Sequence, residues 1–129
     1  EKDGVAYYND SKGTNPDAAI QGIRAMVRPT VLIAGGYDKG SEYEEWLSAC
    51  RGRAKKLILL GQTAEKIAAA AKKLGLDYVF ASSMEEAVGL AEKAAAPGDA
   101  VLLSPACASW GMFKNYEERG RIFKELVRK

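Results

Sequence analysis

Three short polar segments hold the side chains of this sequence that could do chemistry. Asn9–Asn15 (NDSKGTN) places a carboxylate, an ammonium group and two hydroxyls close together. Gly35–Gly40 (GGYDKG) places Lys39 among glycines, which let a backbone approach a ligand closely. Ser104–Gly111 (SPACASWG) has two hydroxyls in a run of small residues. Cations and hydroxyl donors of this kind suit an anion, especially at the start of a helix.

Each of these segments also has a plainer interpretation. Residues 9–15 fit a solvated turn before a helix, and residues 35–40 fit a surface turn with Lys39 in water. The latter lack the G-x-G-x-x-G spacing of a dinucleotide site, and Gly61–Lys66 lacks the spacing of an ATP phosphate loop. Cys107 has no histidine to activate it, so we expect it and Cys50 to be buried, inert thiols.

The composition excludes several further classes of function. There is no His, so neither a Ser-His or Cys-His nucleophile pair nor a His metal site can form, and the two Cys are too few for a zinc site. The balance of 19 basic and 17 acidic residues favours neither a nucleic acid nor a membrane surface as partner. No run approaches the ~20 apolar residues of a membrane span, and EKDGVAYYND is not a signal segment. We therefore expect a reduced, cytoplasmic setting.

Apolar runs alternate with helical patterns along the chain. The runs predict strands over Val5–Tyr8, Thr30–Ala34, Lys56–Leu60, Asp77–Ala81 and Ala100–Ser104. Continuous apolar strands separated by helices indicate βαβ units. The predicted fold is α/β and Rossmann-like, a three-layer, mostly parallel open sheet of about five or six strands with helices on both faces. In such sheets ligands bind beyond the carboxyl ends of the strands, where all three polar segments fall.

Capping residues set the expected bounds of the helices. The first helix should open at Asn15-Pro16 and extend an apolar stripe as far as Val27, before Pro29 stops it. The expected caps of the others are Ser41 with Glu44 for residues 42–50, Thr63 for residues 64–74, and Ser83 with Glu86 for residues 84–95. A last helix should run from about Phe113 to the C-terminus.

Taken in order, the three segments resemble the C-terminal domain of the bacterial Mur ligases. The most specific match is S-P-A-x-A-S followed by F-x-x-[FY]-x-x-R-G, over Ser104–Gly120. The similarity covers essentially the whole chain and is strongest to the members that add D-glutamate. It implies that residues 1–129 form one amino-acid-binding domain of a larger three-domain ligase. Two departures are Gly111, where the family usually has Asp, and Gly13, where it commonly has Ala.

The resemblance also implies an activity. Mur ligases of this kind use ATP to phosphorylate the carboxylate of UDP-N-acetylmuramoyl-L-alanine in peptidoglycan precursor synthesis, and the amine of D-glutamate attacks the acyl phosphate. By this analogy Asp10 faces the ribose of the nucleotide, and Lys12, the catalytic candidate, faces the phosphates or the acyl phosphate. ATP and magnesium would be held mainly by the central ATPase domain, a partner within the full-length chain. We expect no metal site in residues 1–129 and no activity from them alone.

For the amino acid, the resemblance implies that Thr14 and Lys39 bind the α-carboxylate of D-glutamate. Ser109 and the Tyr116 region would bind its side-chain carboxylate. Two alternatives stay open at this point. One is a related Mur or folylpolyglutamate ligase with another amino acid, although Lys39 and Ser109 favour an acidic one. The other is an α/β small-molecule-binding module without catalysis.

Overall fold

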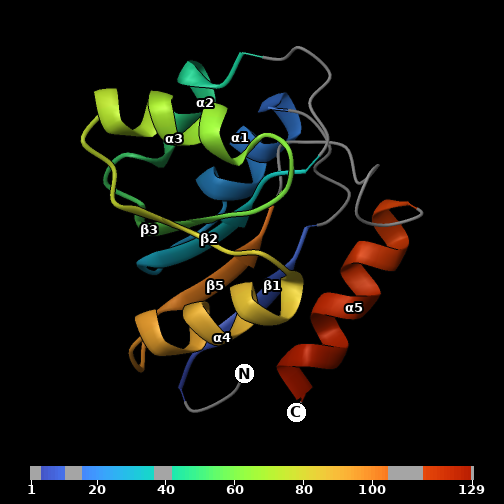
Figure 1. The fold of residues 1–129 in the computed structure, drawn as a ribbon. Helices are drawn as coiled ribbons and strands as arrows, with labels where there is room; N and C mark the ends of the chain where they lie inside the picture. Colours follow the sequence, from blue (N-terminus) through green and yellow to red (C-terminus); the bar gives the residue numbers. More distant parts are fainter. Residues whose placement is uncertain (1–3, 11–15, 37–41, 105–114, 129) are drawn as a thin grey trace.

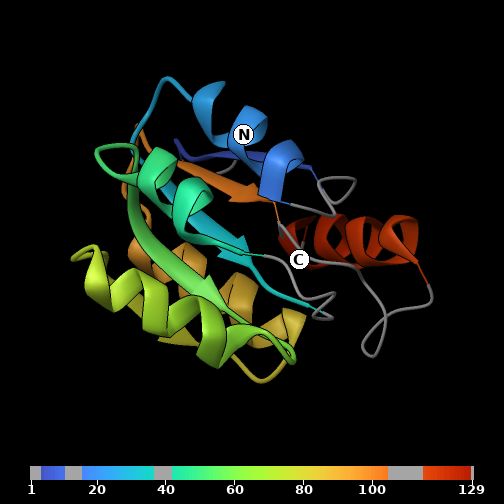
Figure 2. The same cartoon turned by 90° about the horizontal axis from the view of Figure 1, so that it is seen from above.

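A computed structural model describes residues 4–10, 16–36, 42–104 and 115–128. Within them a single sheet has the order β1-β5-β2-β3-β4, and every neighbouring pair of strands is parallel. The strands are β1 (Ala6–Asn9), β2 (Thr30–Ala34), β3 (Ala54–Leu59), β4 (Tyr78–Phe80) and β5 (Ala100–Leu103). Their carboxyl ends therefore lie at one side of the sheet, the carboxyl edge, toward which the strand arrows of Figure 2 point. The opposite side is the amino edge.

Helices cover both faces of the sheet (Figure 1). On one face lie α1 (Pro16–Arg24), α2 (Glu44–Cys50) and α3 (Ala64–Lys73), and on the other α4 (Met84–Ala94) and α5 (Tyr116–Arg128). The expected three-layer α/β fold with a parallel sheet is confirmed.

The core explains why the strands read as continuous apolar runs. Leu32 in the centre of β2 packs among Trp46 and Ile67 on the face of α1, α2 and α3. Its neighbours Val31 and Ile33 pack on the face of α4 and α5. Every residue of β2 is buried, because successive side chains point to opposite faces and both faces are covered. This two-sided burial fixes where the strand ends lie.

The first helix is shorter than expected. It ends at Arg24, and Val27, which the periodicity assigned to the apolar stripe, is 96% exposed. The Arg53 guanidinium donates to the carbonyl oxygens of Arg24 (3.4 Å) and Met26 (3.3 Å), so a side chain from the start of β3 satisfies carbonyls that the helix would otherwise have used. The prediction for Val27 was wrong, because α1 ends before Val27 and these carbonyls accept from the Arg53 side chain rather than from a further turn of helix.

Of the predicted helix caps at Ser83 and Ser41, the first is confirmed and the second is wrong. Ser83 caps α4 as expected, since its Oγ accepts from the Glu86 amide at 3.1 Å, while Glu86 Oε1 accepts from the Ser82 amide at 2.8 Å. The cap predicted at Ser41 was wrong, because α2 begins at Glu44 and its N-cap is Tyr43, without a side-chain bond.

The last helix starts later than the sequence indicated. It begins at Tyr116, where Asn115 Oδ1 accepts from the Glu118 amide at 2.8 Å, a bond typical of an N-cap. The start expected at about Phe113 falls outside the residues that the structure describes. The Asn115 side chain therefore caps a helix that begins at Tyr116.

Candidate functional site

The three polar segments singled out in the sequence leave the sheet from three neighbouring strands. β5 lies between β1 and β2, so the chain that follows each of them starts at the same part of the carboxyl edge. Backbone bonds extend the ladder there, because the Asp10 amide donates to Leu103 O at 2.7 Å and the Ser104 amide to Ile33 O at 3.2 Å. Adjacent strands are about 4.8 Å apart, so the three segments start within about 10 Å of one another.

Asp10 is an ionisable group at this part of the edge, directly after the outermost strand, β1. Its Oδ2 accepts a hydrogen bond from the hydroxyl of Ser104 at 3.0 Å, and Ser104 is fully buried. Burial raises the pKa of the Asp10 carboxyl above its ordinary value, and the Ser104 bond offsets part of that rise. A carboxylate can accept several hydrogen bonds, of which Ser104 supplies one. Asp10 is therefore suited to bind a hydroxyl group of a ligand.

Gly22 of α1 lets the helix lie against this carboxylate. A Cβ placed on Gly22 would be 2.7 Å from Asp10 Oδ2 and 3.1 Å from Ser104 Oγ. Contacts that short do not occur without displacement of a side chain, so only glycine fits here with the present position of Asp10. The helix, β1 and β5 together hold the carboxylate.

Tyr116 reaches the same edge from the other face of the sheet. It is the first residue of α5 and is 38% exposed. One turn later, a Cβ on Gly120 would be 2.7 Å from Asn9 Nδ2, which shows how closely α5 approaches the end of β1. The structure thus brings α5, at Gly120, against the end of β1, directly before Asp10.

The other predicted site residues fall outside the described part of the chain: Lys12, Thr14, Lys39 and Ser109. The same holds for Cys107, Gly13 and Gly111. What the structure describes is the framework from which their segments start. The roles assigned to these residues remain predictions.

Two buried hydroxyls at the carboxyl edge have partners that the sequence did not reveal. Ser104 was one of the two hydroxyls of its polar segment and the last residue of a predicted strand, and Thr63 was the expected cap of α3. Thr63 precedes α3, but its side chain makes no cap bond and instead contacts Gly36, beyond the end of β2. A hydroxyl directly after a buried strand is the signal for Ser104, whereas Thr63 lies four residues beyond β3 and has no such signal.

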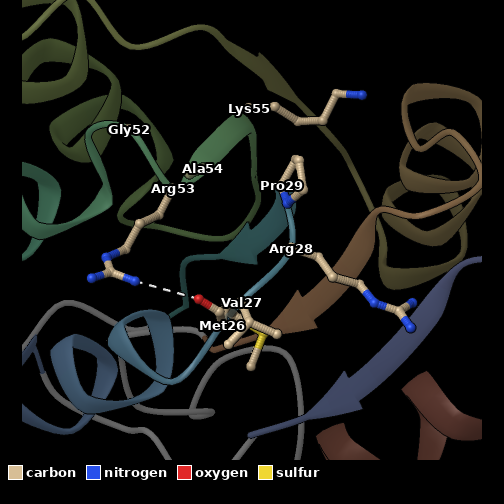
Figure 3. A pocket seen from close by; sticks show the side chains of 8 residues that line it. All are labelled: Met26, Val27, Arg28, Pro29, Gly52, Arg53, Ala54 and Lys55. Atoms are coloured by element: carbon tan, nitrogen blue, oxygen red, sulfur yellow. Dashed lines mark hydrogen bonds between the residues drawn. The ribbon is translucent and has the colours of Figure 1, made fainter.

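A pocket of about 660 Å³ lies at the amino edge, between the turns before β2 and β3. Figure 3 shows Arg28, Arg53 and Lys55 around it, with Arg53 directed at the Met26 carbonyl. Lys55 pairs with the buried Asp99 at 2.6 Å. These cations already serve the structure, and the pocket is at the wrong edge for the site.

Other kinds of site find little support among the described residues. No three side chains of His, Cys, Asp or Glu gather there in a way that could hold a metal ion. Cys50 is fully buried, and desolvation raises its pKa to about 12, as expected for an inert thiol. No helix in these segments is long and apolar enough to cross a bilayer.

The fold and the site together define an α/β domain in which three polar segments and a carboxylate follow the strands at the carboxyl edge of a parallel sheet. Residues 1–107 match the family model described as Mur ligase, glutamate ligase domain. The chain belongs to that family, and the resemblance drawn from its three segments is confirmed.

Among its relatives, the UDP-N-acetylmuramoylalanine–D-glutamate ligase of Lachnospira eligens is 61% identical over 127 residues, and that of Thermoanaerobacter sp. (strain X514) is 61% identical over 130. Both matches cover 98% of this chain but only 28% and 29% of the relatives, so the chain spans less than a third of their length.

Solved structures agree on the fold. A domain from a putative UDP-N-acetylmuramate:L-alanyl-gamma-D-glutamyl-medo-diaminopimelate ligase of Haemophilus ducreyi has a TM-score of 0.62 at 16% identity, covering 96% of this chain and 93% of that one. The UDP-N-acetylmuramate-alanine ligase of Thermotoga maritima has a TM-score of 0.55 at 15% identity, covering 88% of this chain and 25% of that one. At these identities the likeness concerns the fold alone.

Proposed function

We propose that residues 1–129 are the C-terminal, amino-acid-binding domain of a larger ligase that joins D-glutamate to UDP-N-acetylmuramoyl-L-alanine with ATP. The observation that carries this proposal is the 61% identity, over almost the whole chain, to a ligase whose name states that reaction. The geometry supports it, because the segments with Lys12, Lys39 and Ser109 start from three neighbouring strand ends. A dianionic amino acid suits such a set of cations and hydroxyl donors.

In the proposed reaction the chief task of this domain is to position D-glutamate. Thr14 and Lys39 bind its α-carboxylate, and Ser109 and Tyr116 bind its side-chain carboxylate. Two separate anchors fix both the place and the orientation of the amine between them. Holding the amine against the acyl phosphate converts a bimolecular attack into an effectively unimolecular one, which can lower the barrier by several kcal/mol, up to about 10.

The nucleotide is shared with the rest of the ligase. Asp10 accepts from a ribose hydroxyl, and Lys12 places a positive charge at the phosphates or the acyl phosphate, where negative charge develops. Magnesium and the triphosphate are held mainly by the central ATPase domain. The ligase acts in the cytoplasm, where its nucleotide substrates are found. Residues 1–129 alone should therefore release no phosphate from ATP.

A chimera tests the proposal. In the test ligase, this chain replaces the matching segment of the Lachnospira eligens enzyme. We expect phosphate release that requires ATP, UDP-N-acetylmuramoyl-L-alanine and D-glutamate. Lys39→Ala should raise KM for D-glutamate by about tenfold or more, as expected when one charge-assisted contact to a substrate is lost.

The same assay can overturn the proposal. L-alanine, L-lysine and diaminopimelate are offered in place of D-glutamate, and a clear preference for one of them would reassign the amino acid. A folded test ligase that hydrolyses no ATP in the presence of D-glutamate would remove the ligase assignment. An unchanged KM in Lys39→Ala would remove Lys39 from the site.

A further inference from the structure

One buried threonine joins the chain after β3 to the chain after β2. The Thr63 hydroxyl accepts a hydrogen bond from the Gly36 amide at 3.0 Å and donates one to the Gly36 carbonyl at 3.2 Å. The Thr63 amide also donates to the Gly36 carbonyl, at 3.1 Å. Thr63 has no exposed surface. These bonds engage both the amide and the carbonyl of Gly36, so they fix the orientation of its backbone.

The surrounding backbone leaves this arrangement little freedom. A Cβ on Gly61 would lie 2.9 Å from the Gly36 Cα, and a Cβ on Gly35 would overlap the Leu60 carbonyl. Gly35 and Gly61 both have positive φ, which L side chains rarely adopt. Close packing therefore brings the two chains together, and the Thr63 hydroxyl satisfies polar groups of Gly36 that are buried between them.

The location of this contact relates it to the site. Gly36 is the last described residue before Lys39, which follows three positions later in the sequence. Thr63 lies four residues beyond the end of a different strand, β3, and has no part in the ligand contacts proposed above. Its position at the N-terminus of α3 would ordinarily lead its hydroxyl to cap that helix, yet α3 has no side-chain cap bond. The hydroxyl is used for Gly36 instead.

We propose that Thr63 is a positioning residue for the amino-acid site. By fixing the Gly36 backbone it sets the direction in which the chain leaves β2 toward Lys39, and so it sets the affinity for the incoming acidic amino acid without touching it. This inference rests on the proposed function of Lys39. It adds a residue from outside the three polar segments to the determinants of that affinity.

The test is steady-state kinetics of the test ligase with Thr63→Val, which keeps the shape and removes the hydroxyl. We expect KM for D-glutamate to rise by about fivefold or more, with KM for ATP and for UDP-N-acetylmuramoyl-L-alanine changed by less than about twofold. Thr63→Ser should restore the wild-type KM within about twofold. Thr63→Ala, which also lacks the hydroxyl and introduces no bulk, replaces Thr63→Val if the latter does not fold.

Thr30→Val is the matched control. Thr30 is equally buried, and its hydroxyl donates to the Arg28 carbonyl at 2.9 Å, but it lies at the amino edge where β2 begins. The same chemical change there should lower stability without a change in KM for D-glutamate. A similar rise in KM from Thr30→Val would mean that any loss of a buried hydroxyl has this effect, and would overturn the proposal.

Combining Thr63→Val with Lys39→Ala provides a sharper readout. If Thr63 acts through the segment with Lys39, its loss should add little once Lys39 is gone, whereas independent effects multiply. Multiplying effects, or an equal rise in all three KM values, would overturn the inference while the proposed function stands. If Lys39→Ala leaves KM for D-glutamate unchanged, the proposed role of Lys39 fails first, and that failure is distinguishable from a failure of the role of Thr63.

Discussion

The Ser104 hydroxyl donates to Asp10 Oδ2 at 3.0 Å, and this bond joins the ends of two neighbouring strands that are 94 residues apart in sequence. It holds a carboxylate that is partly withdrawn from water, and burial raises the pKa of that carboxyl. An ionised group kept in such a place lowers the stability of the fold at neutral pH. Groups held at a cost in stability are often retained for function.

Replacing this carboxylate should therefore stabilise the domain. In Asp10, the folded-state pKa lies above the ordinary value of 3.8, so the penalty on folding is complete above the folded pKa and absent below 3.8. The asparagine side chain is uncharged, so Asp10→Asn removes this penalty. We expect the Tm of residues 1–129 to rise by about 2 °C at pH 7 and the gain to disappear near pH 3. Thermal unfolding followed by circular dichroism at both pH values measures this.

Asp17→Asn is the control, since it removes an exposed carboxylate from the first turn of α1, where negative charge favours the helix. It should lower the Tm slightly, and a gain equal to that of Asp10→Asn would show that net charge alone is responsible. In the test ligase, Asp10→Asn should raise KM for ATP by about tenfold, because a neutral acceptor binds a hydroxyl less strongly than a charged one. An unchanged KM for ATP in Asp10→Asn would show that Asp10 does not bind the nucleotide.

Gly22→Ala should displace the same carboxylate. The added Cβ would lie 2.7 Å from Asp10 Oδ2, the end of a short side chain, so Asp10 has to move away from Ser104. We expect KM for ATP in the test ligase to rise several-fold. Gly89→Ala in α4 is the control, since nothing lies within 4 Å of its new Cβ. It should raise stability by about 0.5–1 kcal/mol with unchanged kinetics. The same KM for ATP in Gly22→Ala and Gly89→Ala would contradict this role of Gly22.

Cys50 should be unreactive in the folded chain. With a pKa of about 12, only about one molecule in ten thousand has a thiolate at pH 8, and the side chain is fully buried. In a Cys107→Ala variant, where Cys50 is the single thiol, Ellman's reagent should give no signal until denaturant is added. Rapid labelling of the native variant would show that this part of the core opens readily.

Local patterns predicted the elements well where burial alone determines them. β2 has the expected bounds, because a strand covered on both faces needs a continuous apolar run and the glycines after it end the run. The order of the strands in the sheet produces no such pattern in the sequence. The sequence therefore could not show that Asp10 and Ser104 are in contact. Thr63 was assigned to a helix cap for a sound local reason, but a tertiary partner, Gly36, uses its hydroxyl instead.

An ion pair at the amino edge should make stability depend on acid pH. Hydrogen bonds from Lys55 Nζ (2.6 Å) and from the Ala96 amide (2.8 Å) lower the pKa of Asp99, whose side chain is only 10% exposed. A carboxyl whose folded-state pKa is depressed stabilises the fold above the ordinary value of 3.8, and the contribution is lost as pH falls through the folded value. Asp99→Asn should therefore cost about 1–2 kcal/mol at pH 7 and progressively less as the pH falls below the ordinary pKa.

Urea unfolding of residues 1–129 at a series of pH values measures this difference between wild type and Asp99→Asn. Asp77→Asn is the matched control, because Asp77 also pairs with a lysine, Lys56, but at 3.7 Å and with 70% of its side chain exposed. Such an exposed pair should contribute less than about 0.5 kcal/mol at any pH. A cost for Asp99→Asn that persists unchanged into acid would show that its packing, and not its charge, holds the turn before β5.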